Sequence, residues 1–197
     1  IRLCLVGSEM CIRDRNITQN TGLEQLSCED NLLTSLDVSN NTSLRYFICG
    51  DNQLSNLDIS ANPALTYLGC HANQLTSLDV TNNTALEVLS FGKNQLSVID
   101  VSNNTSLNEI RCYENQLTSL DLSSNINLTK IDLSYNPLTC LNLKNGFNTN
   151  IVVFNSKENP NLNCIEVDNP SWSTSNWLDV DSNLNFSTNC SYPAGCF

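Results

Sequence analysis

"LTYLGCHANQLTSLDVTNNTA" occupies residues 65–85, and closely similar strings stand on both sides of it. The copies begin 21 residues apart, at Leu23, Leu44, Leu65, Leu86, Leu107 and Leu128. Their shared pattern is L-x-x-L-x-C-x-x-N-x-L-x-x-L-D-V-S-x-N-x-x, and a degraded seventh copy begins at Ile151. A fixed period of this length predicts the stacked coils of a solenoid.

A single copy is too small to fold alone. Each copy offers about six inward apolar side chains, worth roughly 2 kcal/mol each on burial. Ordering its backbone costs on the order of 1–2 kcal/mol per residue. Within a copy, runs such as "QLSCE" and "LDVS" alternate like short strands and should pair in parallel with the same runs of the next coil. The pattern therefore predicts a β-rich solenoid with two short parallel strands per 21-residue coil and no substantial helix.

Two asparagine positions recur along the coils, where the chain must turn. A buried amide side chain has both donor and acceptor atoms, so it can bond the backbone groups that a turn leaves without a ladder partner. We expect both columns to hold turns rather than a ligand. The first column is Asn31, Asn52, Asn73, Asn94, Asn115, Asn136 and Asn159, and the second is Asn41, Asn62, Asn83, Asn104 and Asn125.

The repeat resembles the leucine-rich repeat family in its short, 21-residue variety, sometimes called IRREKO-type. The resemblance covers residues 16–167. It implies a right-handed leucine-rich-repeat superhelix. Because leucine-rich repeats are scaffolds that present surfaces, the resemblance implies a binding module without naming its ligand.

The period stops after Asp168, and residues 168–197 are predicted to form a C-terminal cap and the start of a linker. A solenoid end exposes open core and bare strand edges, and Trp172, Trp177 and Phe186 are large enough to cover them. The stretch "NLNCIEVDNPSWSTSNWLDVDSNLNFSTNC" is similar to secreted bacterial surface proteins of the type IX secretion route. That likeness implies an extracellular or cell-surface location.

The ten cysteines fall into groups with different expectations. Cys28, Cys49, Cys70 and Cys112 share the sixth position of the repeat with Phe91 and Leu133, which favours buried thiols over disulfides or a metal site. Cys140 and Cys164 occupy matching points of the last two coils, and an insertion between them could skew the stacking, so we expect a Cys140–Cys164 disulfide. Cys190 and Cys196 then pair with each other or with residues beyond the chain end.

The outward positions of the first strand vary from coil to coil, while the inward positions stay fixed. Variation on one face of a rigid scaffold is typical of a recognition surface, and Tyr and Arg are common interface anchors. Exposed tyrosine also suits an ordinary strand surface, which is the alternative interpretation. The predicted ligand-binding face consists of Tyr46, Tyr67, His71, Glu109, Arg111 and Tyr113.

A column of carboxylates marks the second outward face. Its members would stand about 4.8 Å apart, so their repulsion must be offset. We expect each carboxylate to accept a backbone N–H in the following turn. The alternative is a row of bound Ca²⁺ ions. The column is Asp37, Asp58, Asp79, Asp100 and Asp121.

Composition disfavours several functions. The chain has 9 Lys and Arg against 20 Asp and Glu, a formal net charge of −11, which disfavours nucleic acid as a partner. No apolar run approaches the ~20 residues of a membrane span. The single histidine, His71, lacks a recognisable catalytic arrangement, so we predict no enzyme and no cofactor. We expect a monomeric binding or adhesion module for protein or polysaccharide. The alternative is a structural spacer without a ligand.

Residues 4–15, "CLVGSEMCIRDR", do not fit the repeat. They resemble a translated transposase-type sequencing adapter, whose codons account for residues 5–14. Repeat phase begins just after them, because Ile17 and Asn20 fall 21 residues before Val38 and Asn41. Residues 1–15 are therefore predicted to be an artefact, disordered or loosely packed, with the solenoid cut in mid-coil.

Overall fold

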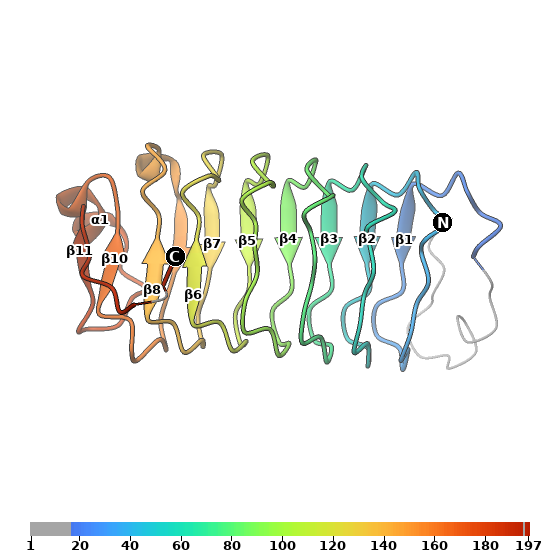
Figure 1. Cartoon of the computed structure of the whole chain (residues 1–197), viewed down its shortest axis with the longest axis horizontal. Coiled ribbons are helices and arrows are strands. Elements are labelled where there is room, and N and C mark those ends of the chain that lie inside the picture. The colour runs from blue at the N-terminus through green and yellow to red at the C-terminus, as the bar shows by residue number, and fades with distance from the viewer. Residues whose placement is uncertain (1–16, 195) are drawn as a thin grey trace.

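The computed structural model describes residues 17–194 and 196–197, so the adapter-like stretch lies outside the described residues. The chain winds into coils that stack side by side in one row (Figure 1). The first runs of the coils form one parallel sheet of seven strands, in the order β1-β2-β3-β4-β5-β7-β9. These strands are β1 (Gln25–Ser27), β2 (Tyr46–Ile48), β3 (Tyr67–Gly69), β4 (Val88–Ser90), β5 (Glu109–Arg111), β7 (Lys130–Asp132) and β9 (Val153–Asn155). The predicted parallel solenoid is confirmed.

Strand register follows the period of the repeat. Tyr46 lies opposite Tyr67, and Tyr67 lies opposite Val88, so each step to the next strand is 21 residues. Since side chains alternate between the two faces of a strand, equivalent residues of successive coils form straight columns. Each column has one environment, either core or surface, over the length of the sheet.

The second runs form strands only toward the C-terminal end. These are β6 (Ser119–Asp121), β8 (Cys140–Asn142), β10 (Cys164–Glu166) and β11 (Asn185–Ser187), paired in the order β11-β10-β8-β6. The prediction of a second strand in every coil was wrong for the earlier coils. There the coils are joined by bonds from the neighbouring turns instead, such as that from the Gln74 amide to the Leu54 carbonyl at 2.9 Å.

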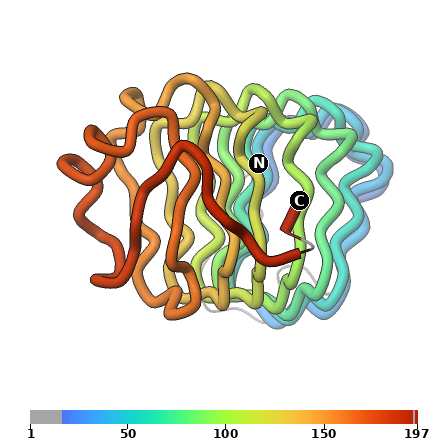
Figure 2. Tube along the Cα trace, turned by 60° about the vertical axis from the view of Figure 1, so that its left-hand side comes forward, coloured from blue at the N-terminus to red at the C-terminus, as the bar shows by residue number. Residues whose placement is uncertain are grey.

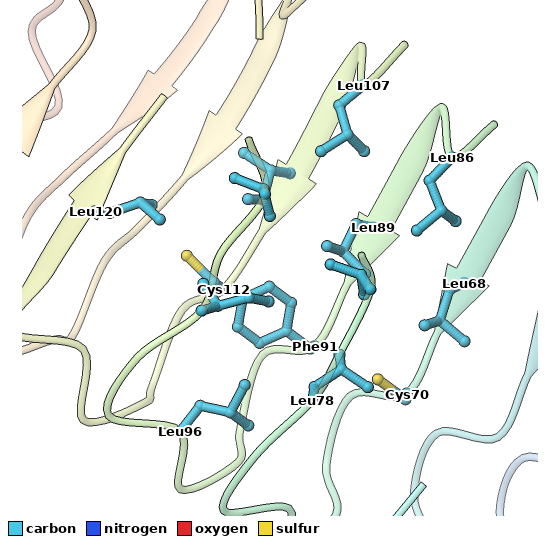
Figure 3. Close-up of a cluster of buried hydrophobic side chains, with 14 of the residues drawn as sticks. Leu68, Cys70, Leu78, Leu86, Leu89, Phe91, Leu96, Leu107, Cys112 and Leu120 are labelled. Carbon is cyan, nitrogen blue, oxygen red and sulfur yellow. The ribbon is translucent and has the colours of Figure 1, made fainter. Parts of the chain in front are cut away.

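The core runs through the interior of the coils (Figure 3). Leucines at the first and fourth positions of the repeat pack in continuous columns, and Leu65, Leu68, Leu86 and Leu89 are fully buried. The sixth position also faces inward, as predicted, because its residues have no exposed surface. They are Cys28, Cys49, Cys70, Phe91, Cys112 and Leu133. Burial raises the pKa of the Cys70 thiol to about 12, so this thiol is inert at neutral pH.

The first asparagine column ties each coil to its neighbour. Asn73 Nδ2 donates to the carbonyls of Cys49, Cys70 and His71 at 3.0, 3.2 and 3.2 Å. Its Oδ1 accepts from the Leu54 amide at 2.9 Å. Two of these partners belong to the preceding coil, so one side chain holds a turn and also spans two coils. The predicted turn-holding role is confirmed.

The second asparagine column spans coils in a similar way. Asn62 Nδ2 donates to the carbonyls of Val38 and Asn41 of the preceding coil, at 3.1 and 2.9 Å. The bonds repeat one coil later, from Asn83 to Ile59 and Asn62. The turns on both sides of the core are therefore linked from coil to coil by buried amides.

The residue before each first-column asparagine has a left-handed backbone, with φ between 51° and 59°, and none of these residues is glycine. They are Asp30, Asp51, Ala72, Lys93, Glu114, Tyr135 and Glu158. A side chain with a Cβ is strained in this region, most severely when it is β-branched. The strain recurs because the turn geometry recurs.

This strain predicts opposite effects for two substitutions at one position. Ala72→Gly is expected to raise the free energy of unfolding by about 0.5 kcal/mol, since relief of strain exceeds the extra entropy of the unfolded chain. Ala72→Val is expected to lower it by about 1–2 kcal/mol. Urea unfolding followed by circular dichroism measures both. If Ala72→Gly and Ala72→Val change the free energy of unfolding equally, the backbone at this position is not strained.

The C-terminal end is closed by aromatic packing. Helix α1 (Pro170–Asn176) follows a short 3-10 helix, η1 (Asn148–Asn150), and starts with the Asn169 side chain accepting from the Trp172 amide at 3.1 Å. Trp177 stacks on Phe154 with ring centroids 4.4 Å apart, and Phe186 meets Trp177 edge-on. Neither helix, nor any other helix within the described part of the chain, is long and apolar enough to span a bilayer.

The predicted Cys140–Cys164 disulfide was wrong. Cys140 is bonded to Cys196 and Cys164 to Cys190, with Cα–Cα distances of 5.8 and 5.9 Å. Cys140 and Cys164 lie on the paired strands β8 and β10, where in-register side chains leave the sheet in the same direction. The chain after β11 returns across these coils (Figure 2) and brings a partner to each cysteine.

Candidate binding face

One face of the seven-stranded sheet gathers the side chains that the sequence singled out. Tyr46 and Tyr67 come from the first positions of β2 and β3, and Arg111 comes from the last position of β5. His71 and Tyr113 follow β3 and β5 at equivalent points of their coils. We call these five residues the strand-face patch. The rigid register of the sheet fixes which columns they occupy.

The two tyrosines form a stacked pair. Their ring centroids are 4.4 Å apart, and the ring planes differ by 23°. Tyr46 is 36% exposed, so the pair presents aromatic surface to solvent. Burial and the neighbouring Tyr46 raise the pKa of the Tyr67 phenol, so its hydroxyl stays a hydrogen-bond donor at neutral pH. A stacked, polar-tipped pair of this kind can contact both apolar and hydroxyl groups of a ligand.

His71 and Tyr113 rest on glycines of the preceding coils. A Cβ placed on Gly50 would lie 2.5 Å from His71 Cε1, and a Cβ on Gly92 would lie 2.5 Å from Tyr113 Cε1. Each ring therefore packs directly on the backbone of a glycine, where the Cβ of any other residue would collide with it. His71 Nε2 is also 3.1 Å from Asp51 Oδ2. The sequence carries a signal for this arrangement, because Gly50, His71, Gly92 and Tyr113 follow one another in one outward column, so that glycine alternates with a ring.

Glu109 belongs to the predicted face but lies beneath it. Its side chain is 7% exposed and pairs with the guanidinium of Arg111 and, at 3.4 Å, with Lys130 Nζ. Both cations are about half exposed. Glu109 thus supports Arg111 and Lys130 from below and offers little surface to a ligand. Lys130 is missing from the predicted face, although it follows Glu109 in the same outward column.

The centre of the face carries no net charge. Between Tyr67 and Arg111 the outward positions are Val88, Gly69 and Ser90, and the last two are buried. Carboxylates adjoin the patch: Asp51 meets His71, Glu109 meets Arg111 and Lys130, and Asp132 lies beside Arg111 on the next strand. The strand-face patch is therefore aromatic, with an uncharged centre and charged groups at its edges.

Comparison with solved structures identifies this architecture. The chain is similar to an internalin from Listeria monocytogenes, with a TM-score of 0.68 and 22% identity over 89% of this chain and 50% of that one. It is also similar to a leucine-rich-repeat protein of Leptospira interrogans, with a TM-score of 0.64 and 19% identity over 87% and 57%. The chain has a leucine-rich-repeat fold. At these identities the likeness concerns the fold alone, and the chain spans 50% of the internalin and 57% of the Leptospira protein.

Two other comparisons add little to the leucine-rich-repeat assignment. A family model described as the LVIVD repeat matches residues 89–115, which is about one coil of the solenoid. No curated protein matches the chain. Leucine-rich-repeat solenoids are typically scaffolds without enzymatic activity, and their exposed sheets serve protein interactions.

The carboxylate column of the leucine-rich-repeat solenoid holds its own turns. Asp79 Oδ1 accepts from the Thr81 amide at 2.9 Å and from the Thr81 hydroxyl at 2.7 Å. These bonds lower the pKa of the Asp79 carboxyl. Equivalent backbone bonds reach Asp37, Asp58, Asp100 and Asp121. Among residues 17–194 and 196–197, no three His, Cys, Asp or Glu side chains come together as a metal site.

This bonding predicts how stability depends on pH. The lowered pKa of Asp79 stabilises the fold above the ordinary aspartate value near 4, and that contribution is lost as pH falls through the folded-state value. Asp79→Asn keeps an acceptor and does not titrate, as Asn142 shows by accepting from the Lys144 amide at 3.0 Å. We expect the variant to lose less stability than the unmodified protein between pH 5 and pH 3, measured by urea unfolding. If both proteins lose the same stability between pH 5 and pH 3, the Asp79 carboxyl does not contribute to the pH dependence.

Proposed function

We propose that this chain is an extracellular or cell-surface binding or adhesion module that recognises a protein or polysaccharide through the strand-face patch. The observation that carries the proposal is the collection of Tyr46, Tyr67, His71, Arg111 and Tyr113 on one face of a rigid sheet. Tyrosine and arginine are the residues most often found as binding anchors, and aromatic rings also stack on sugars.

The proposed location has its own support. Disulfides persist in oxidising compartments, and the chain carries two of them in its C-terminal part. The similarity of residues 161–190 to type IX secretion proteins favours export by that route. Within this proposal the chain acts as a monomer without catalysis, because the fold supplies a surface rather than an enclosed site.

A binding screen with matched variants tests the proposal. The chain would be screened against glycan arrays and surface-protein libraries, and any binder would be retested with Tyr46, Tyr67 and Tyr113 changed to alanine. We expect binding to fall at least about tenfold, as for loss of interface anchors. The control changes the exposed Thr34, Thr76 and Thr118 of the opposite side to alanine. Binding that survives the tyrosine changes but not the threonine changes would overturn the proposed face.

The second candidate function is a structural spacer that holds another module away from the cell surface. It is favoured by the pairing of polar groups within the face itself, since His71 meets Asp51, and Arg111 and Lys130 share Glu109. A surface whose polar groups are already paired has less need of a partner. A spacer function predicts that the screen finds no binder. It also predicts that changing the three tyrosines to alanine leaves the activity of the module held by the spacer unaltered.

A further inference from the structure

The last residues of the chain form a strap across the four-stranded sheet. We use this word for residues 188–194 together with Cys196. From β11 the strap turns back over β10 and β8, toward earlier coils (Figure 2). Lys144 Nζ donates to the Thr188 carbonyl at 3.1 Å where the strap begins. Segments far apart in sequence are therefore joined at the C-terminal end of the solenoid.

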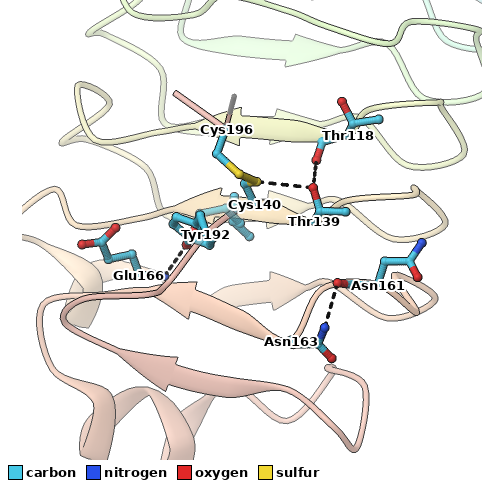
Figure 4. The surroundings of a disulfide bond; sticks show 9 residues. Thr118, Thr139, Cys140, Asn161, Asn163, Glu166, Tyr192 and Cys196 are labelled. Carbon is cyan, nitrogen blue, oxygen red and sulfur yellow. Dashed lines mark hydrogen bonds between the residues drawn. A yellow bond between two sulfur atoms is a disulfide. The ribbon is translucent and has the colours of Figure 1, made fainter. Parts of the chain in front are cut away.

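Within the strap, Tyr192 completes a strand ladder from outside. Its hydroxyl accepts from the Glu166 amide of β10 at 3.0 Å and donates to the Leu141 carbonyl of β8 (Figure 4). In a regular parallel ladder of this register, that amide would donate to that carbonyl directly. Strands β8 and β10 are paired at Glu166 and Asn142 alone, whereas β6 and β8 pair along their full length. The tyrosine hydroxyl therefore ties β8 to β10 at the one position where the two strands pair.

Two disulfides hold the tyrosine in place. Cys190 is bonded to Cys164 of β10 on one side of Tyr192, and Cys196 is bonded to Cys140 of β8 on the other. Cys164 and Cys196 are partly exposed, so one cysteine of each bridge lies at the surface, where a reductant can approach. The sixth-position thiols of Cys49, Cys70 and Cys112 are fully buried in the core and cannot exchange with the bridges.

We propose that the strap is a redox-sensitive clasp that ties β8 to β10 when oxidised and releases the last coils when reduced. The reductant is a dithiol. One of its thiolates attacks a bridge sulfur to form a mixed disulfide, and its second thiol resolves that bond. Each bridge takes up two electrons and two protons and becomes two cysteine thiols, while one dithiol becomes a disulfide. Both bridges together consume two dithiols.

Release of the strap affects one end of the solenoid. Without Tyr192, the Glu166 amide and the Leu141 carbonyl each lose one partner. The last coil then keeps the Glu166–Asn142 pairing and the bonds that the Gly146 and Asn159 amides donate to Asp168 and Asp181. The seven-stranded sheet shares no strand with this region, and β3 lies well away from it in the row of coils. The strand-face patch is therefore expected to keep its structure in both redox states.

Hydrogen exchange with mass spectrometry tests the clasp. The folded protein would be compared before and after dithiothreitol, with reduction verified by alkylation of four additional thiols. We expect exchange across 164–167 and 185–187 to rise about tenfold or more, as for release of a local unit, with no change at 67–69. Complete reduction with unchanged exchange in both C-terminal segments would overturn the proposal. So would a peptide map of the oxidised protein that links Cys140 to any residue other than Cys196.

Two variants separate the disulfides from the tyrosine. The Cys190→Ser, Cys196→Ser double variant is expected to show the fast exchange without reductant and to stop responding to dithiothreitol. Tyr192→Phe keeps both bridges and removes only the hydroxyl, so the amide of Glu166 should exchange about tenfold faster while 185–187 stays protected. An unchanged Glu166 amide in Tyr192→Phe would show that β8 and β10 close without the tyrosine, against the proposed clasp.

Discussion

Asn73→Ala is expected to lower the free energy of unfolding by about 3–5 kcal/mol, one of the two largest effects of a single side chain in this solenoid. The substitution removes the donor that meets the carbonyls of Cys49, Cys70 and His71. It also removes the acceptor that meets the Leu54 amide. The Leu54 amide then stays buried without a partner. The three carbonyls keep one donor each, from the Asn52 and Asn94 side chains and the Asp51 amide.

Urea unfolding followed by circular dichroism measures this loss. The matched control is Asn82→Ala, because Asn82 is an exposed asparagine of the other turn. We expect the control to change stability by less than about 0.5 kcal/mol. Asn73→Asp is a second variant, which keeps oxygen acceptors but brings a carboxylate against three carbonyls, and it should be at least as damaging as alanine. If Asn73→Ala lowers the free energy of unfolding by less than about 1 kcal/mol, the Asn73 hydrogen bonds do not hold the coils together as proposed.

Much of the fold follows from the sequence because each repeat position has one environment. Cys70 and Phe91 differ in size and chemistry, yet their shared position in the period marks both as core. Asn73 sits where a turn needs both donors and acceptors, so its role follows from amide chemistry and position. Stacking repeats this logic in each coil, and the repeat specifies the columns of the surface as well as those of the core.

Features outside the period did not follow from the sequence. The partners of Cys140 and Cys164 depend on the path of the strap, which no repeat describes. Glu109 occupies an outward column but is buried, because two neighbouring cations extend over it. The second strands depend on how closely adjacent coils approach, which a single copy of the repeat does not specify. In each case the outcome depends on contacts between coils or on side-chain conformation rather than on repeat position.

Phe91→Ala is expected to lower the free energy of unfolding by about 3–5 kcal/mol. Phe91 is fully buried, and its ring lies between Cys70 and Cys112 in the core (Figure 3). Removing the ring loses its transfer free energy and leaves a cavity, because the backbone on both sides is fixed by the strand ladder and by the asparagine bonds of Asn94. A site held in this way collapses poorly around a void. Urea unfolding measures the loss.

Two further substitutions at this position decide whether volume or repeat consensus controls stability. Cysteine is the residue that the other coils favour, and consensus changes often stabilise proteins. Here Phe91→Cys is expected to cost about 2–4 kcal/mol, since the core around the ring is packed for a larger side chain. Phe91→Leu, which imitates Leu133 in the same column, should cost about 1–2 kcal/mol. The predicted order of stability is Phe, Leu, Cys, Ala. A stabilised Phe91→Cys would mean that coil-specific packing is subordinate to the repeat pattern in this core.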